Sequence, residues 1–315
     1  MRILVTGGNG YVGRTLCRHL MADHDVTVVD NLRSGDVRFE PAELERIDFR
    51  KADIRDTSEI EQVMNDVQPE AVVHLAAVHF IPDCENDPSL AISINVEGTS
   101  SLWSVTPPGT RVVVASTAAV YAPEDTPHNE QTSPVGPMDI YGLTKWQTEQ
   151  YTTYWAKKRN LAATIVRLFN VIGPGETNPH ILPAILAQAL RGETTLGLGN
   201  CHPKRDYIDV TDVAGGFAAA ALGKAMPGET DIVNLGTGEA WSVYELVEVL
   251  SEVSGQDFTI ETDPTRVRKS DRPFLAADNA KMRERYGFSP KLKLADALRE
   301  LWANPDVPAA LLETC

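Results

Sequence analysis

The sequence lacks the features by which membrane-spanning, exported and nucleic-acid-binding proteins are usually recognised. It contains no apolar run close to the roughly 18 residues of a membrane-spanning helix, and its start shows no secretory pattern. Basic residues are scarce: 29 Lys and Arg stand against 44 Asp and Glu, for a formal charge of −15. A surface of that sign repels phosphate backbones and anionic lipid. We therefore expect binding to neither nucleic acid nor a membrane.

Cysteine is scarce as well. The four cysteines lie far apart and include no CxxC pair: Cys17, Cys84, Cys201 and Cys315. This distribution is typical of a reducing compartment and not of a disulfide framework. We expect a cytoplasmic protein without a metal site.

The remaining composition is that of an ordinary globular protein. The chain has 315 residues, of which 43% are hydrophobic and 23% charged. Such a balance argues against disorder, and the length allows about two domains. No internal repeat or low-complexity tract is present.

Apolar strand-like runs alternate with helical patterns through the first half of the chain. Near-continuous apolar strands separated by helices indicate a parallel sheet covered on both faces. The expected strands are 3–5, 26–29, 71–77, 111–115 and 163–168, and the expected helices are 14–21, 58–67 and 145–158. We predict an α/β fold, a doubly wound parallel sheet of the Rossmann type, over residues 1–170. Glycine and proline interrupt the pattern after about residue 170. Residues 171–315 are expected to form mainly a smaller α+β lobe, with later segments crossing back into the first domain.

A glycine turn follows the first strand and opens the first helix. Gly7, Gly10 and Gly13 stand at regular spacing around Tyr11 and Val12. Missing side chains let the backbone approach a pyrophosphate, which then sits on the helix N-terminus. In this strand–helix context, the turn predicts a dinucleotide site.

An acidic residue ends the second strand. Asp30 is placed to accept hydrogen bonds from the adenosine ribose and would repel a 2′-phosphate, which favours NAD over NADP. Its neighbour Asn31 is assigned to the same site. Asp53 and Ile54 follow the next strand-like stretch, where they would flank the adenine.

A tyrosine and a lysine stand four residues apart at the start of a helical pattern. This spacing places Tyr141 and Lys145 on one helix face. An ammonium beside a phenol lowers the phenol pKa, so the tyrosine becomes a usable proton acceptor. Thr117 ends the preceding strand, and its hydroxyl would share a substrate hydroxyl with the tyrosine.

With these motifs in order, the chain resembles the extended short-chain dehydrogenase/reductase family, in its nucleotide-sugar epimerase/dehydratase branch. The resemblance runs over essentially the whole chain. It is carried by TGGNGYVG, HLAA, NVEGT, STAAVY, YGLTK, RLFNVIGPG, RDYIDVTDVA and NLGTGE. It implies tightly held NAD that is recycled in place, and a nucleotide-sugar substrate.

The resemblance also assigns residues. Thr117, Tyr141 and Lys145 match the catalytic triad, and Asn95 matches the asparagine that supports the active-site network. Leu75, Ala76 and Ala77, in the HLAA stretch, are assigned to the cofactor. The residues assigned to the substrate are His79, Asn170, His180, Leu198, Arg205, Arg268 and Asp271. Arginine binds phosphate oxygens bidentately, as a diphosphate requires.

The branch is indicated by two alanines. Dehydratases of this family carry an Asp-Glu pair directly after the threonine, and decarboxylating members keep a glutamate there. Here the positions hold Ala118 and Ala119, which cannot shuttle a proton. The remaining chemistry is oxidation, rotation of the keto sugar and return of hydride, which is 4-epimerisation as in UDP-glucose 4-epimerase-like enzymes. A UDP-sugar is the expected substrate.

Several alternatives for the reaction and for the sugar stay open. His79 replaces a frequent lysine and would either contact the cofactor or act as a second acid/base, as a 5-epimerase requires. Glu176, Thr177 or His180 could reach the sugar, and a keto-reductase could use the same site. Leu275, at the position that gates N-acetylated sugars, does not decide between hexose and N-acetylhexosamine. A non-catalytic NAD-binding protein is disfavoured, because such proteins usually lose Tyr141 or Lys145.

The helix led by Tyr141 is rich in aromatic residues. Trp146, Tyr151, Tyr154 and Trp155 offer more aromatic surface than one sheet contact needs. We expect a homodimer through this helix.

Overall fold

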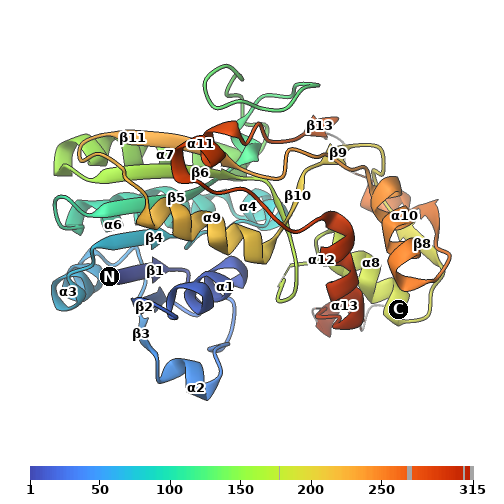
Figure 1. Cartoon of the computed structure of the whole chain (residues 1–315), viewed down its shortest axis with the longest axis horizontal. Helices are drawn as coiled ribbons and strands as arrows, with labels where there is room; N and C mark the ends of the chain where they lie inside the picture. The colour runs from blue at the N-terminus through green and yellow to red at the C-terminus, as the bar shows by residue number, and fades with distance from the viewer. Residues whose placement is uncertain (177, 268–271, 308, 313–315) are drawn as a thin grey trace.

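The fold is built on one large parallel sheet. The computed structural model describes residues 1–176, 178–267, 272–307 and 309–312. Seven strands, all parallel, lie in the order β11-β6-β5-β4-β1-β2-β3 (Figure 1). They are β1 (Arg2–Thr6), β2 (Asp25–Asp30), β3 (Ile47–Lys51), β4 (Ala71–His74), β5 (Arg111–Thr117), β6 (Ala162–Leu168) and β11 (Thr230–Leu235). The predicted Rossmann-type sheet is confirmed.

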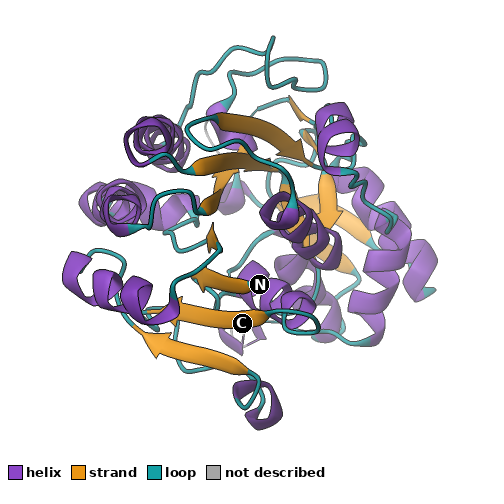
Figure 2. Ribbon diagram, turned by 60° about the vertical axis from the view of Figure 1, so that its left-hand side comes forward, coloured by secondary structure: helices purple, strands orange, loops and turns teal. Residues whose placement is uncertain are grey.

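Helices cover both faces of this sheet (Figure 2). One face carries α1 (Tyr11–Leu20) and α9 (Val210–Leu222), which pack on each other. Phe217 of α9 shares an apolar core with Ile3 and Val5 of β1. The other face carries α3 (Thr57–Val67), α6 (Thr99–Val105) and α7 (Ile140–Arg159). A second apolar core fills that side, around Leu4, Trp103 and Ile165. Strands buried on both faces explain the near-continuous apolar runs of the sequence.

The lobe beside the sheet is assembled from strand pairs and helices. Its pairs are β7 (Asn170–Ile172) with β10 (Tyr207–Asp209), β8 (Thr195–Leu198) with β12 (Thr259–Thr262), and β9 (Lys204–Arg205) with β13 (Phe274–Leu275). Its helices are α8 (Ile181–Leu190), α10 (Val243–Ser254), α12 (Leu294–Ala303) and α13 (Ala309–Leu312), which gather at one end of the molecule (Figure 1). Leucines such as Leu186, Leu246 and Leu298 form its core.

Short elements fill the connections. They are α2 (Pro41–Leu44), α4 (Ile81–Asn86), α5 (Pro88–Ile92), a π-helical segment η1 (Ser93–Gly98), the 3₁₀ turns η2 (Ala118–Val120) and η3 (Pro264–Arg266), and α11 (Ala280–Tyr286). Within the described parts of the chain, we find no helix with the length and apolar character needed to cross a membrane.

Two expected boundaries differ from the structure for local reasons. The strand expected at 71–77 ends at His74, because the Asn95 side chain pairs with both backbone groups of Val78 and holds this stretch away from the sheet. The helix expected at 145–158 begins at Ile140, because the Asp139 carboxylate accepts a hydrogen bond from Gly142 N at 2.7 Å and caps it.

A buried ion pair fixes α7 to the sheet. The Arg167 guanidinium of β6 donates two hydrogen bonds to Glu149 of α7, at 2.9 and 2.7 Å. Ser116 of β5 donates a third to the same carboxylate, at 2.6 Å. Both charged side chains are at most 4% exposed. The pair therefore locks the helix to the two strands beside it.

We predict that Glu149→Gln lowers the free energy of unfolding by about 3–5 kcal/mol, because it leaves the buried guanidinium without its counter-charge. Glu43→Gln is the matched control, since Glu43 makes the same bidentate pair with Arg18, whose side chain is 42% exposed. Its cost should be below about 1 kcal/mol. Urea unfolding of both variants measures the difference, and equal costs would contradict the role assigned to burial.

Candidate active site

A cavity of about 630 Å³ lies at the carboxyl ends of the strands, where the second lobe meets the sheet. Open α/β sheets bind ligands at this edge. Its walls include the glycine turn after β1, the ends of β2, β5 and β6, and parts of β8, β9 and β13. Most of the predicted cofactor and substrate residues therefore face one shared space.

The glycine turn has the geometry of a phosphate cradle. Gly7 has φ +69°, and a Cβ there would lie 2.6 Å from the Ala76 nitrogen. At Gly13 a Cβ would lie 2.2 Å from the Gly7 carbonyl oxygen. Helix α1 then starts at Tyr11 with no side-chain cap and no acidic residue in its first turn. Its N-terminal N–H groups are thus left to an anion, so these residues fit a dinucleotide pyrophosphate. Gly10, Tyr11, Val12, Leu75, Ala76 and Ala77 all line the cavity.

The acidic end of β2 also faces the cavity. Asp30 accepts backbone hydrogen bonds from Asn9 at 3.1 Å and Leu32 at 2.8 Å. Burial raises its pKa above the ordinary value, whereas these bonds oppose the shift. Asn31 lines the cavity too and donates to Asp53 at 3.0 Å.

Of the neighbouring residues Asp53 and Ile54, both predicted to flank the adenine, one lines the cavity and the other does not. Arg55 grips the Asp53 carboxylate with two hydrogen bonds, which holds the Asp53 pKa well below its usual range. Asp53 stands behind the cavity wall and supports Asn31, whereas Ile54 lines the cavity itself.

The three predicted catalytic side chains meet at the cavity floor. Thr117 ends β5 and Tyr141 lies in the first turn of α7, and the Thr117 side chain acts on the phenol in the direction that lowers its pKa. Lys145 is 3% exposed and donates from Nζ to the Ala115 carbonyl oxygen at 2.8 Å. Burial lowers the pKa of Lys145 to about 8.

The tyrosine departs from one expectation. The sequence predicts that Lys145 lowers the Tyr141 pKa, but in the protein alone burial raises it well above 10, while the hydrogen bond from Thr117 opposes the rise. The physical reason is that burial disfavours the charged phenolate by more than the neighbouring groups favour it.

Asn95 supports the site from behind. Its amide accepts from Val78 N at 2.8 Å and donates to Val78 O at 2.9 Å and to Thr144 at 3.0 Å. Asn95 is 1% exposed and does not line the cavity. It holds the loop before His79 against the turn of α7 that carries Tyr141 and Lys145.

The predicted substrate residues occupy the opposite wall. Asn170, Leu198 and Arg205 line the cavity from β7, β8 and β9. Arg205 donates from Nη1 to the backbone oxygens of Lys204 and Arg272, both at 2.8 Å. Its neighbour Asp206 is fully buried and accepts bonds from Thr237, Gly238 and Ala277. Arg268, Asp271 and Thr177 lie outside the described residues.

A polar cluster spans the cavity between the two lobes. His180 contacts the Glu176 carboxylate at 3.0 Å, and His79 contacts the Asn178 amide at 2.9 Å. The two imidazole rings lie 6.3 Å apart. Because an amide nitrogen only donates, Nε2 of His79 accepts, which places the His79 proton on Nδ1. Neighbouring protein atoms around this ring lower the His79 pKa, with Glu176 opposing the shift, although the residue remains exposed at the cavity surface.

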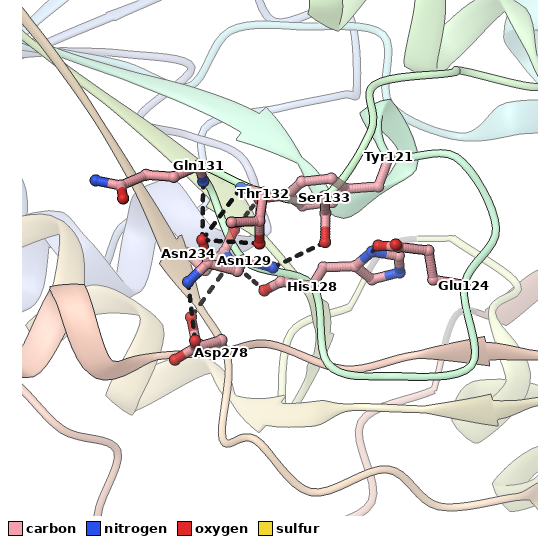
Figure 3. Close-up of polar contacts among 9 residues, drawn as sticks. All are labelled: Tyr121, Glu124, His128, Asn129, Gln131, Thr132, Ser133, Asn234 and Asp278. Carbon is pink, nitrogen blue, oxygen red and sulfur yellow. Dashed lines mark hydrogen bonds and ion pairs between the residues drawn. The ribbon is translucent and has the colours of Figure 1, made fainter.

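The segment that joins Thr117 to Tyr141 is anchored by polar contacts (Figure 3). The Tyr121 ring stacks on His128 with centroids 4.7 Å apart, and its hydroxyl donates to Asn234 at 2.8 Å. Asn234 donates in turn to the His128 carbonyl, and Asn129 donates to Asp278. These contacts tie the segment to β11 and to the chain after β13.

Sequence reasoning missed two kinds of residue. Asn178 and Arg272 line or border the cavity without belonging to any recognised motif. Glu149 lies in a predicted helix and Arg167 in a predicted strand. A charged residue at a position expected to be buried could have indicated the ion pair between them. In the described ranges, which omit 177, 268–271, 308 and 313–315, no three His, Cys, Asp or Glu side chains are grouped to hold a metal ion.

The chain is similar to known proteins both in sequence and in structure. Residues 3–236 match the model of the NAD dependent epimerase/dehydratase family. A UDP-glucose 4-epimerase of Corynebacterium glutamicum is 32% identical over 321 residues, covering 96% of this chain and 95% of the relative.

Two solved structures are similar over nearly the whole chain. The UDP-glucose 4-epimerase of Thermotoga maritima with UDP-glucose has a TM-score of 0.85 and 28% identity, covering 96% of this chain and 98% of its own. The UDP-glucose 4-epimerase of Brucella ovis in complex with NAD has a TM-score of 0.84 and 27% identity, covering 96% and 97%. On the cavity geometry, the matched family model and these similarities, the chain belongs to the NAD dependent epimerase/dehydratase family.

Proposed function

We propose that this protein is an NAD-dependent nucleotide-sugar 4-epimerase that acts on a UDP-hexose or UDP-N-acetylhexosamine. The observation that carries the proposal is the meeting of Thr117, Tyr141 and Lys145 in a cavity shared with the glycine turn. The similar proteins named as UDP-glucose 4-epimerases support the choice of reaction and nucleotide.

The chain's own residues account for the proton transfers. Tyr141, as phenolate, takes the proton of the sugar 4-hydroxyl, and Thr117 holds that hydroxyl in place by a hydrogen bond. NAD, when bound, supplies the acceptor for the hydride from C4 and gives it back. Tyr141 then returns its proton to the 4-oxygen of the opposite epimer, so no net redox change occurs.

The two alanines after Thr117 restrict the chemistry. Ala118 and Ala119 are 1% and 7% exposed and form part of the cavity wall. Neither can donate or accept a proton, so elimination of water from the keto sugar lacks its acid/base pair. This supports epimerisation over dehydration.

The division of the cavity suits a rotating intermediate. Asn170 and Arg205 lie on the wall of the second lobe, and the reacting groups lie on the sheet. Arginine holds a diphosphate bidentately. A nucleotide held there leaves the sugar free to present its other face, as return of hydride to the opposite side requires.

A second candidate function is 5-epimerisation. The observation that favours it is the Glu176–His180 pair beside the cavity, because a carboxylate next to an imidazole is a usual acid/base arrangement. Removal and return of the proton at C5 would label that carbon in deuterium oxide, whereas 4-epimerisation leaves the sugar carbons unlabelled. Product NMR in deuterium oxide therefore separates the two, and consumption of NADH would identify a keto-reductase.

We predict that the purified protein carries stoichiometric NAD(H). The reason is that the glycine cradle and Asp30 hold the dinucleotide, and the reaction regenerates it. Heat-released supernatant should contain nicotinamide cofactor without a 2′-phosphate, identified by mass spectrometry. Recovery of NADP alone would contradict the role of Asp30.

We predict that Tyr141→Phe nearly abolishes turnover in a screen of UDP-, GDP-, CDP- and dTDP-sugars by product NMR. A phenyl ring cannot exchange the hydroxyl proton, so the rate should fall by about 10²–10⁴. Nucleotide binding should survive, because Asn170 and Arg205 are on the other wall. Thr117→Ala is the milder comparison, since it removes one hydrogen bond that water can partly replace.

Two results would overturn this assignment. If the wild-type protein makes a 4-keto-6-deoxy sugar, the argument from Ala118 and Ala119 fails. If Tyr141→Phe epimerises at the wild-type rate, the triad assignment fails.

The exposed aromatic face of α7 supports a homodimer. Trp146, Tyr151 and Tyr154 are 37%, 45% and 53% exposed. Trp155 differs, because it donates to Ser100 at 3.0 Å and packs within the chain. Contiguous exposed apolar surface marks protein interfaces.

We predict a dimer by light scattering at micromolar concentration. Tyr151→Arg combined with Tyr154→Arg should give a monomer, because two charges would be buried without partners. Tyr244→Arg is the control, since Tyr244 is similarly exposed, at 44%, on the second lobe. A monomeric wild type would reject the interface.

A further inference from the structure

Arg272 connects the wall of the second lobe to the catalytic segments. It immediately precedes Pro273 and β13, and its side chain is only 10% exposed. Its Nη2 donates to the Ala119 carbonyl oxygen at 2.8 Å, and its Nη1 lies 3.6 Å from the Asp139 carboxylate. One guanidinium thus contacts both segments that carry the triad.

Each of these contacts leads directly to a reacting side chain. Ala119 donates its backbone N–H to the Thr117 hydroxyl at 3.1 Å. Asp139 caps the helix turn that holds Tyr141, through Gly142 N. Gly142 itself is pressed against Ala119, because a Cβ there would lie 2.6 Å from the Ala119 oxygen. Arg272 therefore braces the junction at which Thr117 and Tyr141 meet.

The backbone of the same residue faces the substrate wall. The Arg272 carbonyl oxygen accepts a hydrogen bond from Nη1 of Arg205 at 2.8 Å. Strands β9 and β13 pair in parallel beside it, Lys204 with Phe274 and Arg205 with Leu275. Arg272 is thus linked by its backbone to a proposed diphosphate ligand and by its side chain to the triad.

We propose that Arg272 is a positioning residue of the 4-epimerisation reaction, which fixes the Thr117–Tyr141 geometry and neutralises the Asp139 charge beside the phenol. The role rests on the proposed function. It assigns Arg272 no contact with substrate or cofactor.

The charges around Tyr141 explain why neutralisation matters. The phenol lies near Cys84 of α4 and Asp139 at the helix cap, and a negative charge on either group would raise its pKa in addition to burial. Cys84 is itself a neutral thiol at working pH, since burial raises its pKa to about 11. Lys145 lies one turn further along α7, and Glu85 accepts a hydrogen bond from Ile140 N at 2.8 Å. Asp139 is therefore the close negative charge that Arg272 offsets.

The test titrates the phenol in the NAD-bound protein. Ultraviolet difference spectra, with the Tyr141→Phe form of each variant subtracted, report the Tyr141 phenolate without requiring turnover. We expect Arg272→Met to move the midpoint upward by about one pH unit and to lower kcat at neutral pH by about tenfold. The affinity for UDP, measured by calorimetry, should change less than the rate.

Three further variants separate charge from folding. Arg272→Lys should restore most of the titration midpoint, because the charge is kept. Asp139→Asn keeps a cap oxygen and should lower the midpoint, both alone and in the Arg272→Met background. Arg159→Met is the matched control at the far end of α7, where Arg159 donates to the Thr106 carbonyl. It should leave the midpoint and the rate unchanged.

The outcomes are decisive in each case. A phenol midpoint that does not move in Arg272→Met overturns the proposal, as does an equal loss of rate and UDP affinity. If Arg272→Met fails to fold, Asp139→Asn alone decides, since an unmoved midpoint there overturns the proposal too. Absence of epimerisation in the wild-type protein would instead refute the proposed function, and the titration would still report on Arg272.

Discussion

The buried Glu149–Arg167 ion pair is the interaction on which the site depends. Its two charges lie in the interior, where their mutual hydrogen bonds, the Ser116 hydroxyl and the Tyr121 ring over the guanidinium compensate for lost water. The pair joins a helix to the two strands beneath it, so α7 has one allowed position along the sheet. The meeting of strand end and helix start, with a threonine on one and a tyrosine on the other, follows from that constraint.

The chain order makes this constraint necessary. The segment between Thr117 and Tyr141 is mostly irregular, and loops of this length do not by themselves fix the distance between their ends. Three interactions hold the ends of this segment in place. They are the buried Glu149–Arg167 pair, the Tyr121–His128 stack and the hydrogen bond from the Arg272 guanidinium. Rigid support of this kind keeps reacting groups within bonding distance.

The sheet and the glycine turn could be predicted from the sequence, because strand periodicity and the absence of side chains are properties of adjacent residues. The fold class and the family were predictable on that basis. The residue at which β4 ends could not be predicted, because it depends on a hydrogen bond from Val78 to Asn95, which lies further along the sequence. Arg272 was not predictable either, because its partners Ala119 and Asp139 lie more than 130 residues away in the sequence and no motif marks it. The pKa of Tyr141 likewise depends on burial, which spacing alone does not reveal.

The position of α9 and β11 in the sequence has a consequence for how the chain folds. Helix α9 supplies Phe217, Ala218 and Ala221 to the apolar core that also holds Ile3 and Val5. The face of the sheet that α1 covers in part is therefore completed only by residues made more than two hundred positions after the first strand. Such long-range closure slows folding and prolongs exposure of apolar surface. The nascent chain should need protection until the β11 segment has left the ribosome.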